Sequence, residues 1–391
     1  MQHLKILAVA STMDLRYRLG CTPAWWQLWK ALHETGHEVI VTPYLGDPVD
    51  ALWRRTYPNP CRTESLLYNR YLLARKATGR APAGATLLSP VLRQLVERDV
   101  RPKWKRHIQT VIEKERDVDA VLFMNVPLNH LHGIPTEVLE PLGIPSVFYD
   151  GDMPSILPEY TAERGFRFNY YDGADLAEYT FFLVNSEAVV PRVTSMGARM
   201  VFPFHFAVDP ELFSPVDVAK SADVSYFALS GVAREEWMTK LIAFPSRNLP
   251  LRRFRVAGGP FGFDLGNARY QGDLTYSQYR DFCCGSVINL NITSRTHATF
   301  RGTSTSRPFE LAALKSCIVS QPYDGIETWF EPEKELVVAR DEREAVERYE
   351  QLLDDPEVAE EFGRRARDRV LREHTYRHRA LELIRRLREA R

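Results

Sequence analysis

The chain has 391 residues, more than one hydrophobic core usually serves, so two domains are expected. Hydrophobic residues make up 45% and charged residues 26% of the sequence, a balance that is typical of globular proteins and excludes a largely disordered chain. Because 51 basic residues meet 51 acidic ones, the zero net charge gives no electrostatic reason to expect a nucleic acid as partner.

The five cysteines predict neither a disulfide framework nor a zinc site, because their number is odd and no C-x-x-C spacing occurs. A reducing compartment fits this pattern best, and we expect a cytoplasmic protein. No apolar run approaches the ~18 residues of a membrane span, so we expect no transmembrane segment. The stretch Met1–Ser11 is short and interrupted by Lys5, which favours a first strand over a signal peptide.

The first half of the chain alternates predicted strands and helices, as parallel α/β sheets do. Leu4–Ala10 and Glu38–Pro43 are expected to be strands, with a helix at Pro23–His33 between them. Further strands are expected at 120–125, 146–149, 181–185 and 200–204, and a helix at 136–142. The polar, Arg-rich stretch 47–105 is expected to be mostly helical and to form an insertion or a partner surface.

A second series of elements follows the segment 205–215, whose prolines and Asp indicate a linker. Its strands are expected at 224–229, 253–257, 287–292 and 317–320. The tail is expected to be helical, with helix caps at Asp341, Asp355 and Thr375. Two such series predict an α/β protein of two facing Rossmann-like domains, with the last helix packed back against the body.

The clearest local signal is the sequence GTSTSRPFE at 302–310. Because proline disfavours helix in the residue before it, Arg307 is expected to cap a helix that begins at Pro308. The preceding polar loop would present N–H groups and a helix dipole that suit phosphate. Arg307 could add a forked contact to that phosphate, and Glu310 could accept hydrogen bonds from a ribose. The alternative is that Glu310 merely completes a helix cap.

Four segments of the C-terminal half, 307–313, 324–327, 353–371 and 374–379, resemble in their order the bacterial spore-maturation-type glycosyltransferases. These belong to the GT-B superfamily, some of whose members carry an E-x7-E motif. The resemblance extends over about residues 205–385, whereas in the first half it is limited to the strand pattern and Asp152-Met153-Pro154. It implies an acceptor-side domain at 1–205, a nucleotide-sugar donor domain at 206–375 and a C-terminal helix at 376–391.

The resemblance also implies roles for the 302–310 segment. Glu310 matches the second Glu of E-x7-E and would hold the donor ribose. The donor phosphates would be held by the loop residues Thr303, Ser304, Thr305 and Ser306, together with Arg307. The first Glu of the motif falls on Gly302, so the carboxylate that usually contacts the donor sugar is missing there.

Two further segments resemble donor contacts of the same family. Gly231 and Arg234 follow the first strand of the second domain and match the loop that offers a basic residue to the diphosphate. Gly272, Leu274 and Tyr279 match the segment that lines the base pocket. These assignments are carried over from the resemblance alone.

Polar residues at the ends of first-domain strands are the catalytic candidates. Asp150 and Asp152 form a D-x-D that could hold a divalent metal, but Asp152 is favoured as an acceptor contact or catalytic base, and no metal is expected. Sites form at the strand ends of open α/β sheets, so an imidazole at His130 or His132 could take a proton from an acceptor hydroxyl. Of the two, His132 is our candidate; the alternative is that both are solvated loop histidines.

The resemblance implies a glycosyltransferase that moves a sugar, expected to be a hexose, from a nucleoside-diphosphate sugar to an acceptor hydroxyl. The sugar nucleotide would be a co-substrate, and no other cofactor is expected. The acceptor could be a small natural product, a glycan or a protein. One alternative is a GT-B-fold nucleotide-sugar epimerase or hydrolase, against which the large insertion at 47–105 argues. The other is a non-catalytic nucleotide-binding scaffold, which the missing first Glu favours.

Overall fold

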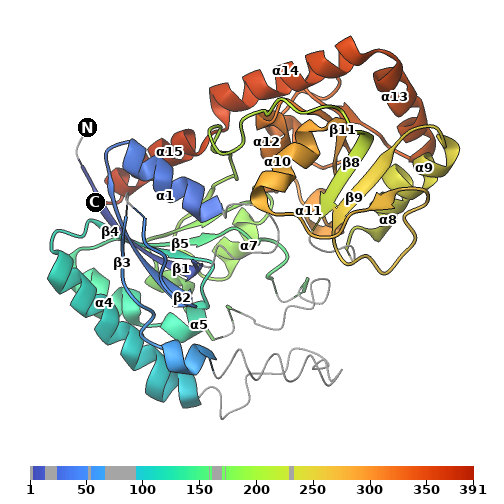
Figure 1. The fold of residues 1–391 in the computed structure, drawn as a ribbon. Coiled ribbons are helices and arrows are strands. Elements are labelled where there is room, and N and C mark those ends of the chain that lie inside the picture. The colour runs from blue at the N-terminus through green and yellow to red at the C-terminus, as the bar shows by residue number, and fades with distance from the viewer. Residues whose placement is uncertain are drawn as a thin grey trace.

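The computed structural model describes residues 3–13, 24–51, 54–66, 94–157, 159–160, 170–171, 173–228 and 233–391. These residues form two parallel sheets, each covered by helices on both faces (Figure 1). The first sheet ends with Pro203 and the second begins with Ala222. The predicted architecture of two Rossmann-like α/β units is confirmed.

The first sheet has, within the described residues, the strand order β3-β2-β1-β4-β5-β6-β7, and all neighbours are parallel. Its strands are β1 (Lys5–Thr12), β2 (Glu38–Leu45), β3 (Arg55–Thr56), β4 (Ala120–Met124), β5 (Ser146–Asp150), β6 (Phe181–Val184) and β7 (Val201–Pro203). Its α-helices are α1 (Ala24–Glu34), α4 (Arg101–Glu115), α5 (Leu128–Leu131) and α7 (Val190–Ser195). Short turns of other helix types are η1 (Val96–Val100), η2 (Pro135–Leu139), η3 (Glu140–Leu142) and η4 (Leu176–Glu178). The helix expected at 136–142 is thus a π-helical turn followed by a 3₁₀ turn.

The second sheet has the order β10-β9-β8-β11-β12-β13 in the described part of the chain, again all parallel. Its strands are β8 (Ala222–Ala228), β9 (Phe254–Gly258), β10 (Arg269–Tyr270), β11 (Ser286–Asn291), β12 (Cys317–Ser320) and β13 (Val337–Val338). The helical segments are α8 (Glu235–Met238), η5 (Thr239–Ala243), α9 (Phe244–Asn248), α10 (Tyr276–Cys284), α11 (Arg295–Thr299), α12 (Ser306–Ala313), η6 (Ile326–Thr328), α13 (Glu342–Asp354), α14 (Pro356–Glu373) and α15 (Tyr376–Glu389).

Successive side chains of β1 point to opposite faces of the sheet, and both faces are covered, which explains why most of the strand is apolar. Leu7 points into a core cluster shared with Trp104 of α4, whereas Ala8 points into a cluster shared with Trp29 of α1. A parallel strand covered on both faces buries every residue, so period-two polarity is absent. Both faces of the first sheet are therefore closed by helices, and only its strand ends are open for a site.

The last helix, α15, leaves the second domain and lies beside α1 on the first sheet (Figure 1). Its residues Ala380, Leu383 and Ile384 are buried in the same core cluster as Trp29. The preceding helix, α14, stays with the second domain. The predicted packing of the C-terminal helix across the body is confirmed, and it ties the first domain to the end of the chain. Among the described residues, no helix is long and apolar enough to cross a membrane.

The linker between the sheets is held by charged and backbone contacts. The Lys30 ammonium of α1 lies 2.7 Å from the Asp209 carboxylate and 2.8 Å from that of Glu211. The amide of Val208 donates to the carbonyl of His374 at 3.2 Å, so the linker runs beside the α14–α15 junction. The two crossings of the chain between the domains therefore lie side by side.

Candidate active site

The carboxyl ends of the two sheets meet where the segment after β6 contacts the loop before α12. The amide of Ser304 donates to the carbonyl of Asn185 at 2.8 Å, and the Asn185 side-chain amide donates back to the Ser304 carbonyl at 3.1 Å. The hydroxyls of Ser186 and Thr303 lie 2.6 Å apart. Because β6 belongs to the first sheet and α12 to the second domain, these bonds join the two domains at their strand ends.

These bonds divide the predicted phosphate loop into two parts. Thr303 donates its amide to the carbonyl of Phe300 at 3.1 Å, so its N–H, like that of Ser304, is engaged within the protein. Thr305 and Ser306 stand at the beginning of α12, where the first N–H groups of a helix have no acceptor inside the helix. The amides placed for an anion are therefore those of Thr305 and Ser306, while Thr303 and Ser304 hold the domains together.

The start of α12 differs from the prediction. Thr305 is the N-cap with extended backbone (φ −131°, ψ 158°), and Ser306 is the first helical residue. Pro308 is thus the third residue of the helix, not the first, and Arg307 is not the cap. Proline fits there because the missing N–H of a first-turn residue costs the helix no hydrogen bond.

Glu310 and Arg307 form a buried cluster with Tyr279 of α10. The Tyr279 hydroxyl donates to Glu310 Oε2 at 3.3 Å and also contacts the Arg307 guanidinium. Arg307 Nη1 lies 3.7 Å from the same Glu310 oxygen, and its guanidinium lies 4.9 Å from the ring centre of Phe227. The Glu310 side chain is 2% exposed and that of Arg307 18%, so a ligand would reach Arg307 first.

Tyr279 is fully buried, so it orients the charged pair instead of lining an open base pocket. The role implied for Glu310, holding a ribose, stays a prediction. A ribose could reach this carboxylate only if the Arg307 side chain turned outward, because the guanidinium and the phenol occupy the nearer positions.

Arg234 and Arg307 both act electrostatically on the phenol of Tyr226. Burial raises the pKa of Tyr226, and the positive charges of the two arginines both act against that rise. This hydroxyl donates to the carbonyl of Ile292, just beyond the end of β11, at 2.8 Å. The charges of both arginines therefore act at the carboxyl end of the second sheet, and Arg307 itself lies in the first turn of α12.

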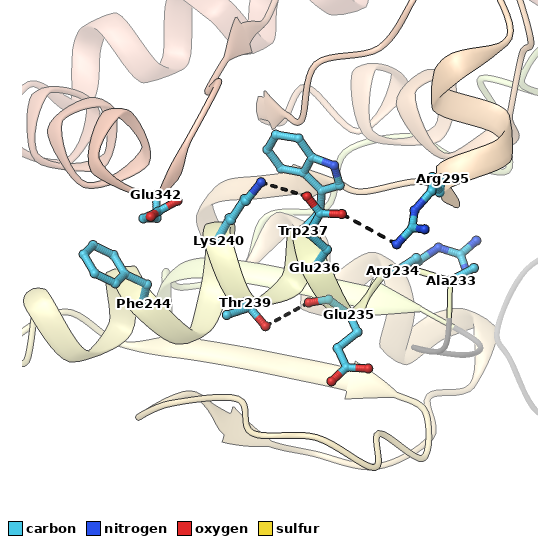
Figure 2. A pocket seen from close by; sticks show the side chains of 10 residues that line it. All are labelled: Ala233, Arg234, Glu235, Glu236, Trp237, Thr239, Lys240, Phe244, Arg295 and Glu342. Atoms are coloured by element: carbon cyan, nitrogen blue, oxygen red, sulfur yellow. Dashed lines mark hydrogen bonds and ion pairs between the residues drawn. The ribbon is translucent and has the colours of Figure 1, made fainter.

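Arg234 also lines an open cavity of about 520 Å³ on the second domain. Figure 2 shows it at one end of the cavity with Arg295, while Phe244 and Glu342 lie at the other. Within the cavity, Glu236 is shared between Lys240 at 2.8 Å and Arg295 at 3.7 Å. The basic character of this surface is concentrated at the Arg234 end.

The other implied donor contacts fall in different places. Gly231 lies outside the described residues. Gly272 has φ +73° and accepts a hydrogen bond from the Gly258 amide at 2.7 Å, which puts it at the carboxyl end of β9. Leu274 is buried and lines a cavity with Ser221 and Gly285, which precede β8 and β11 at the opposite edge of the sheet. The geometry supports a base-pocket position at Gly272 more than at Leu274.

Gly302 has a structural reason to be glycine. Its φ is +64°, and a Cβ atom there would lie 2.8 Å from the side-chain carbons of Glu187. The Glu187 carboxylate is partly exposed and lies 3.6 Å from His205 Nε2. A carboxylate from the first domain thus occupies the space into which a side chain at 302 would project. Sequence reasoning missed Glu187, because nothing in the chain order connects it to Gly302.

The two aspartates after β5 have different surroundings. Asp150 is fully buried, and its carboxylate accepts from the Tyr171 hydroxyl at 2.5 Å and from the Asp152 amide at 2.9 Å. Asp152 is partly exposed and accepts from the Asn125 side-chain amide at 2.8 Å. Asp150 therefore positions Asp152. No group of three or more His, Cys, Asp or Glu in the described part of the chain could hold a metal ion; the expectation that no metal is used stays a prediction.

The two histidines after β4 differ in their exposure and in their partners. His132 Nε2 lies 2.6 Å from the Glu97 carboxylate in a partly exposed pair at the start of the α4 segment. His130 is 8% exposed, its Nδ1 contacts the Tyr44 hydroxyl, and burial lowers its pKa to about 4. The imidazole that the structure places in a strand-end cavity is that of His130, not that of the predicted His132.

Residues 234–385 match the protein family described as glycosyl transferase-like. No curated protein matches the sequence. The matched segment begins at Arg234 and includes the whole Tyr279–Arg307–Glu310 cluster, so the donor-side candidates with described positions all lie within it.

Solved structures resemble the chain over its whole length. Sucrose-phosphate synthase from Thermosynechococcus elongatus superposes with a TM-score of 0.64 at 14% identity, covering 98% of both chains. Alr3699/HepE from Anabaena, in complex with UDP, gives 0.61 at 12% identity and covers 100% of both chains. A trehalose-6-phosphate protein from E. coli, bound with UDP-2-fluoro glucose, gives 0.57 at 10% identity, covering 98% of this chain and 99% of that one. The family match covers residues 234–385, and the solved structures show that the whole chain has the GT-B fold.

Proposed function

We propose that this glycosyltransferase transfers a hexosyl group from a nucleoside-diphosphate sugar to an acceptor hydroxyl in the cleft between its domains. Residues 206–375 would bind the donor, and residues 1–205 the acceptor, with 376–391 as the helix that returns to the first domain. The spore-maturation-type glycosyltransferases are the subfamily that the order of motifs resembles. No metal and no further cofactor are part of the proposal.

The position of Arg307 in the first turn of α12 carries this proposal, and Arg234, whose charge acts on the same Tyr226 phenol, supports it. When the bond between the sugar and the diphosphate breaks, negative charge grows on the leaving phosphate oxygens. Fixed positive charges and helix N–H groups stabilise such charge without having to reorganise during the reaction. The Anabaena neighbour is solved with UDP and with UDP-glucose, which makes a uridine donor the first to test.

Asp152 is the proposed base on the acceptor side. It would take the proton of the acceptor hydroxyl while the new sugar–oxygen bond forms. Its neighbour Gly151 faces the ring of Phe206, since a Cβ on Gly151 would lie 3.2 Å from that ring. The Phe206 amide in turn donates to the Ser304 hydroxyl at 2.9 Å, one residue before the cap of α12. This chain of contacts supports a placement of Asp152 beside the donor loop.

Glu187 weakens the case for a non-catalytic scaffold. The missing first Glu of E-x7-E was the sequence feature that favoured that alternative. A partly exposed carboxylate nevertheless lies next to Gly302, although it comes from the first domain. We include Glu187 in the proposed donor site as a contact to the sugar.

The test is calorimetric titration with UDP, GDP, TDP and ADP, each paired with its nucleoside. One diphosphate should bind well above its nucleoside, and Arg234→Ala should remove most of that difference. Arg340→Ala is the matched control, because Arg340 forms an exposed pair with Glu344 on α13. Equal binding of diphosphate and nucleoside to the parent protein would contradict the proposed phosphate site.

A further inference from the structure

A second cavity, of about 100 Å³, lies in the first domain at the carboxyl ends of β1, β2 and β4. Its wall is mostly apolar, with Leu45, Leu95, Val96, Val100 and Pro127 as the main hydrophobic contributors. Leu95, which lines the cavity, is 41% exposed although it is a large apolar side chain. The position fits a small-molecule site, because open α/β sheets bind ligands at this edge.

Most polar groups in the cavity wall are already used within the protein. The Ser65 hydroxyl accepts from Asn59 at 3.0 Å, and the Glu64 carboxylate is paired with Lys103. The two ends of the Asn125 side chain are engaged by the Gly151 amide at 3.0 Å and by Asp152 at 2.8 Å. These groups therefore keep only part of their hydrogen-bonding capacity for a polyhydroxylated ligand.

His130 is the exception. Its Nδ1 contacts the Tyr44 hydroxyl, whereas Nε2 is buried and has no hydrogen-bond partner among the described residues. With the whole residue only 8% exposed, water has little access to this atom. A buried polar atom without a partner costs free energy, so a ligand that pairs with it gains affinity. The cavity thus has apolar walls, and the His130 side chain that lines it carries one buried polar atom that a ligand reaches once the imidazole turns towards the cavity.

We infer that this cavity holds the apolar body of the acceptor, an aromatic or aliphatic alcohol, with one of its polar groups on His130 Nε2. A free sugar would bring many hydroxyl groups and find few partners, and a phosphorylated ligand would find no unpaired cation among the described wall residues. The reacting hydroxyl would lie towards Asp152, because Asn125 both lines the cavity and holds that carboxylate. The inference rests on the proposed function, and it selects an apolar alcohol among the possible acceptors.

The test measures acceptor binding without any donor. Umbelliferone and naphthol, two fluorescent aromatic alcohols, are titrated into the whole chain, with glucose and sucrose as competitors. Leu95→Asp places a charge on the apolar wall and is matched by Leu142→Asp, an equally simple change at a 58% exposed leucine on the same domain. His130→Phe removes the polar contact, and His130→Gln restores an amide at a similar reach.

We expect both aromatic alcohols to bind the parent and Leu142→Asp with the same affinity. Binding to Leu95→Asp and to His130→Phe should be about tenfold weaker, because each variant loses roughly one hydrogen bond or one apolar contact of similar strength. His130→Gln should recover part of the affinity. Circular dichroism checks that each variant folds, and Leu95→Asp, at an exposed position, keeps the test valid if the buried His130 variants do not fold.

Unchanged binding to Leu95→Asp and His130→Phe, or displacement of the aromatic alcohols by glucose or sucrose, would overturn the inference. The same protein titrated with nucleoside diphosphates separates this failure from that of the proposed function. If diphosphates bind but the aromatic alcohols do not, the donor site is supported and the inference about the cavity is wrong. If the alcohols bind but no diphosphate does, the cavity is an alcohol site and the proposed transfer reaction is wrong.

Discussion

The donor-side and acceptor-side sites are built from the sequence in different ways. The donor side gathers most of its polar residues on one loop and the helix that follows it, from Thr305 to Glu310, with Arg234 and Glu187 added from elsewhere, and it is charged. The acceptor side is assembled from the ends of separate strands and is mostly apolar: Tyr44 lies near the end of β2, and Asn125 and Asp152 follow β4 and β5. A site on one loop leaves a local motif in the sequence, whereas a site made of strand ends does not.

The largest effect should come from Asp152, where the two sites meet. Replacing Asp152 by Asn removes the proposed base while keeping the side-chain shape, so kcat should fall by about 10²- to 10⁴-fold, the usual contribution of a general base. Asp175→Asn is the control, since Asp175 only accepts from the Ala177 amide at an exposed turn. Steady-state kinetics with a nucleotide sugar measure both, and a kcat equal to the parent's would remove Asp152 from the mechanism.

The next effect concerns the stability of the donor side. Glu310→Ala leaves the Arg307 guanidinium without its buried counter-charge, so the free energy of unfolding should fall by about 3 kcal/mol. This differs from the view of Glu310 as a dispensable ribose contact, which predicts nearly unchanged folding. Urea denaturation decides between them: a variant as stable as the parent would show that the cluster does not depend on the carboxylate.

Arg307 variants test whether the donor side binds its ligand mainly through charge. Arg307→Ala should weaken diphosphate binding by about 1.5–3 kcal/mol, the range for hydrogen bonds to charged groups, and nucleoside binding by less. Arg307→Lys should recover only part, because the ammonium lacks the forked geometry. Calorimetry measures the affinity of each variant for the diphosphate and for its nucleoside. Equal losses of binding free energy for both ligands would show that Arg307 does not contact the phosphates.

Restoring the E-x7-E motif should harm this protein. Gly302→Glu forces a side chain into a backbone with φ +64° and against Glu187, so we expect a loss of about 2 kcal/mol in unfolding free energy. Adding Glu187→Gly should relieve the steric part and recover some of it. If the single variant unfolds at the parent's urea midpoint, then Glu187 does not hold the space next to residue 302.

The smallest effect is expected at His132. Its pair with Glu97 is partly exposed, so His132→Gln should change stability by no more than about 0.5 kcal/mol. The sequence-based role as catalytic base would instead require kcat to fall. Stability and kcat measured on the same preparation separate the two views, and a large fall in kcat would return His132 to the active site.

The fold could be predicted from the sequence because its strands are continuous apolar runs separated by helices, as parallel sheets covered on both faces require. The start of α12 was misplaced by two residues, since Pro308 fits the third helical position as well as the first. The neighbour of Gly302 could not be predicted at all, because Glu187 comes from the other domain. Distinguishing His130 from His132 needed the end of α5 at Leu131, because His130 lies within that helix and is buried, whereas His132 follows it and is partly exposed.

The reaction proposed for this protein transfers a sugar across the cleft from a nucleotide-sugar donor to an apolar alcohol. The most direct measurement is the rate of diphosphate release from the nucleotide sugar that binds best, with and without umbelliferone. We predict that release depends on the alcohol and that one glycoside forms for each diphosphate released. Release at the same rate without the alcohol, and no glycoside, would contradict the claim and favour a hydrolase on the same fold.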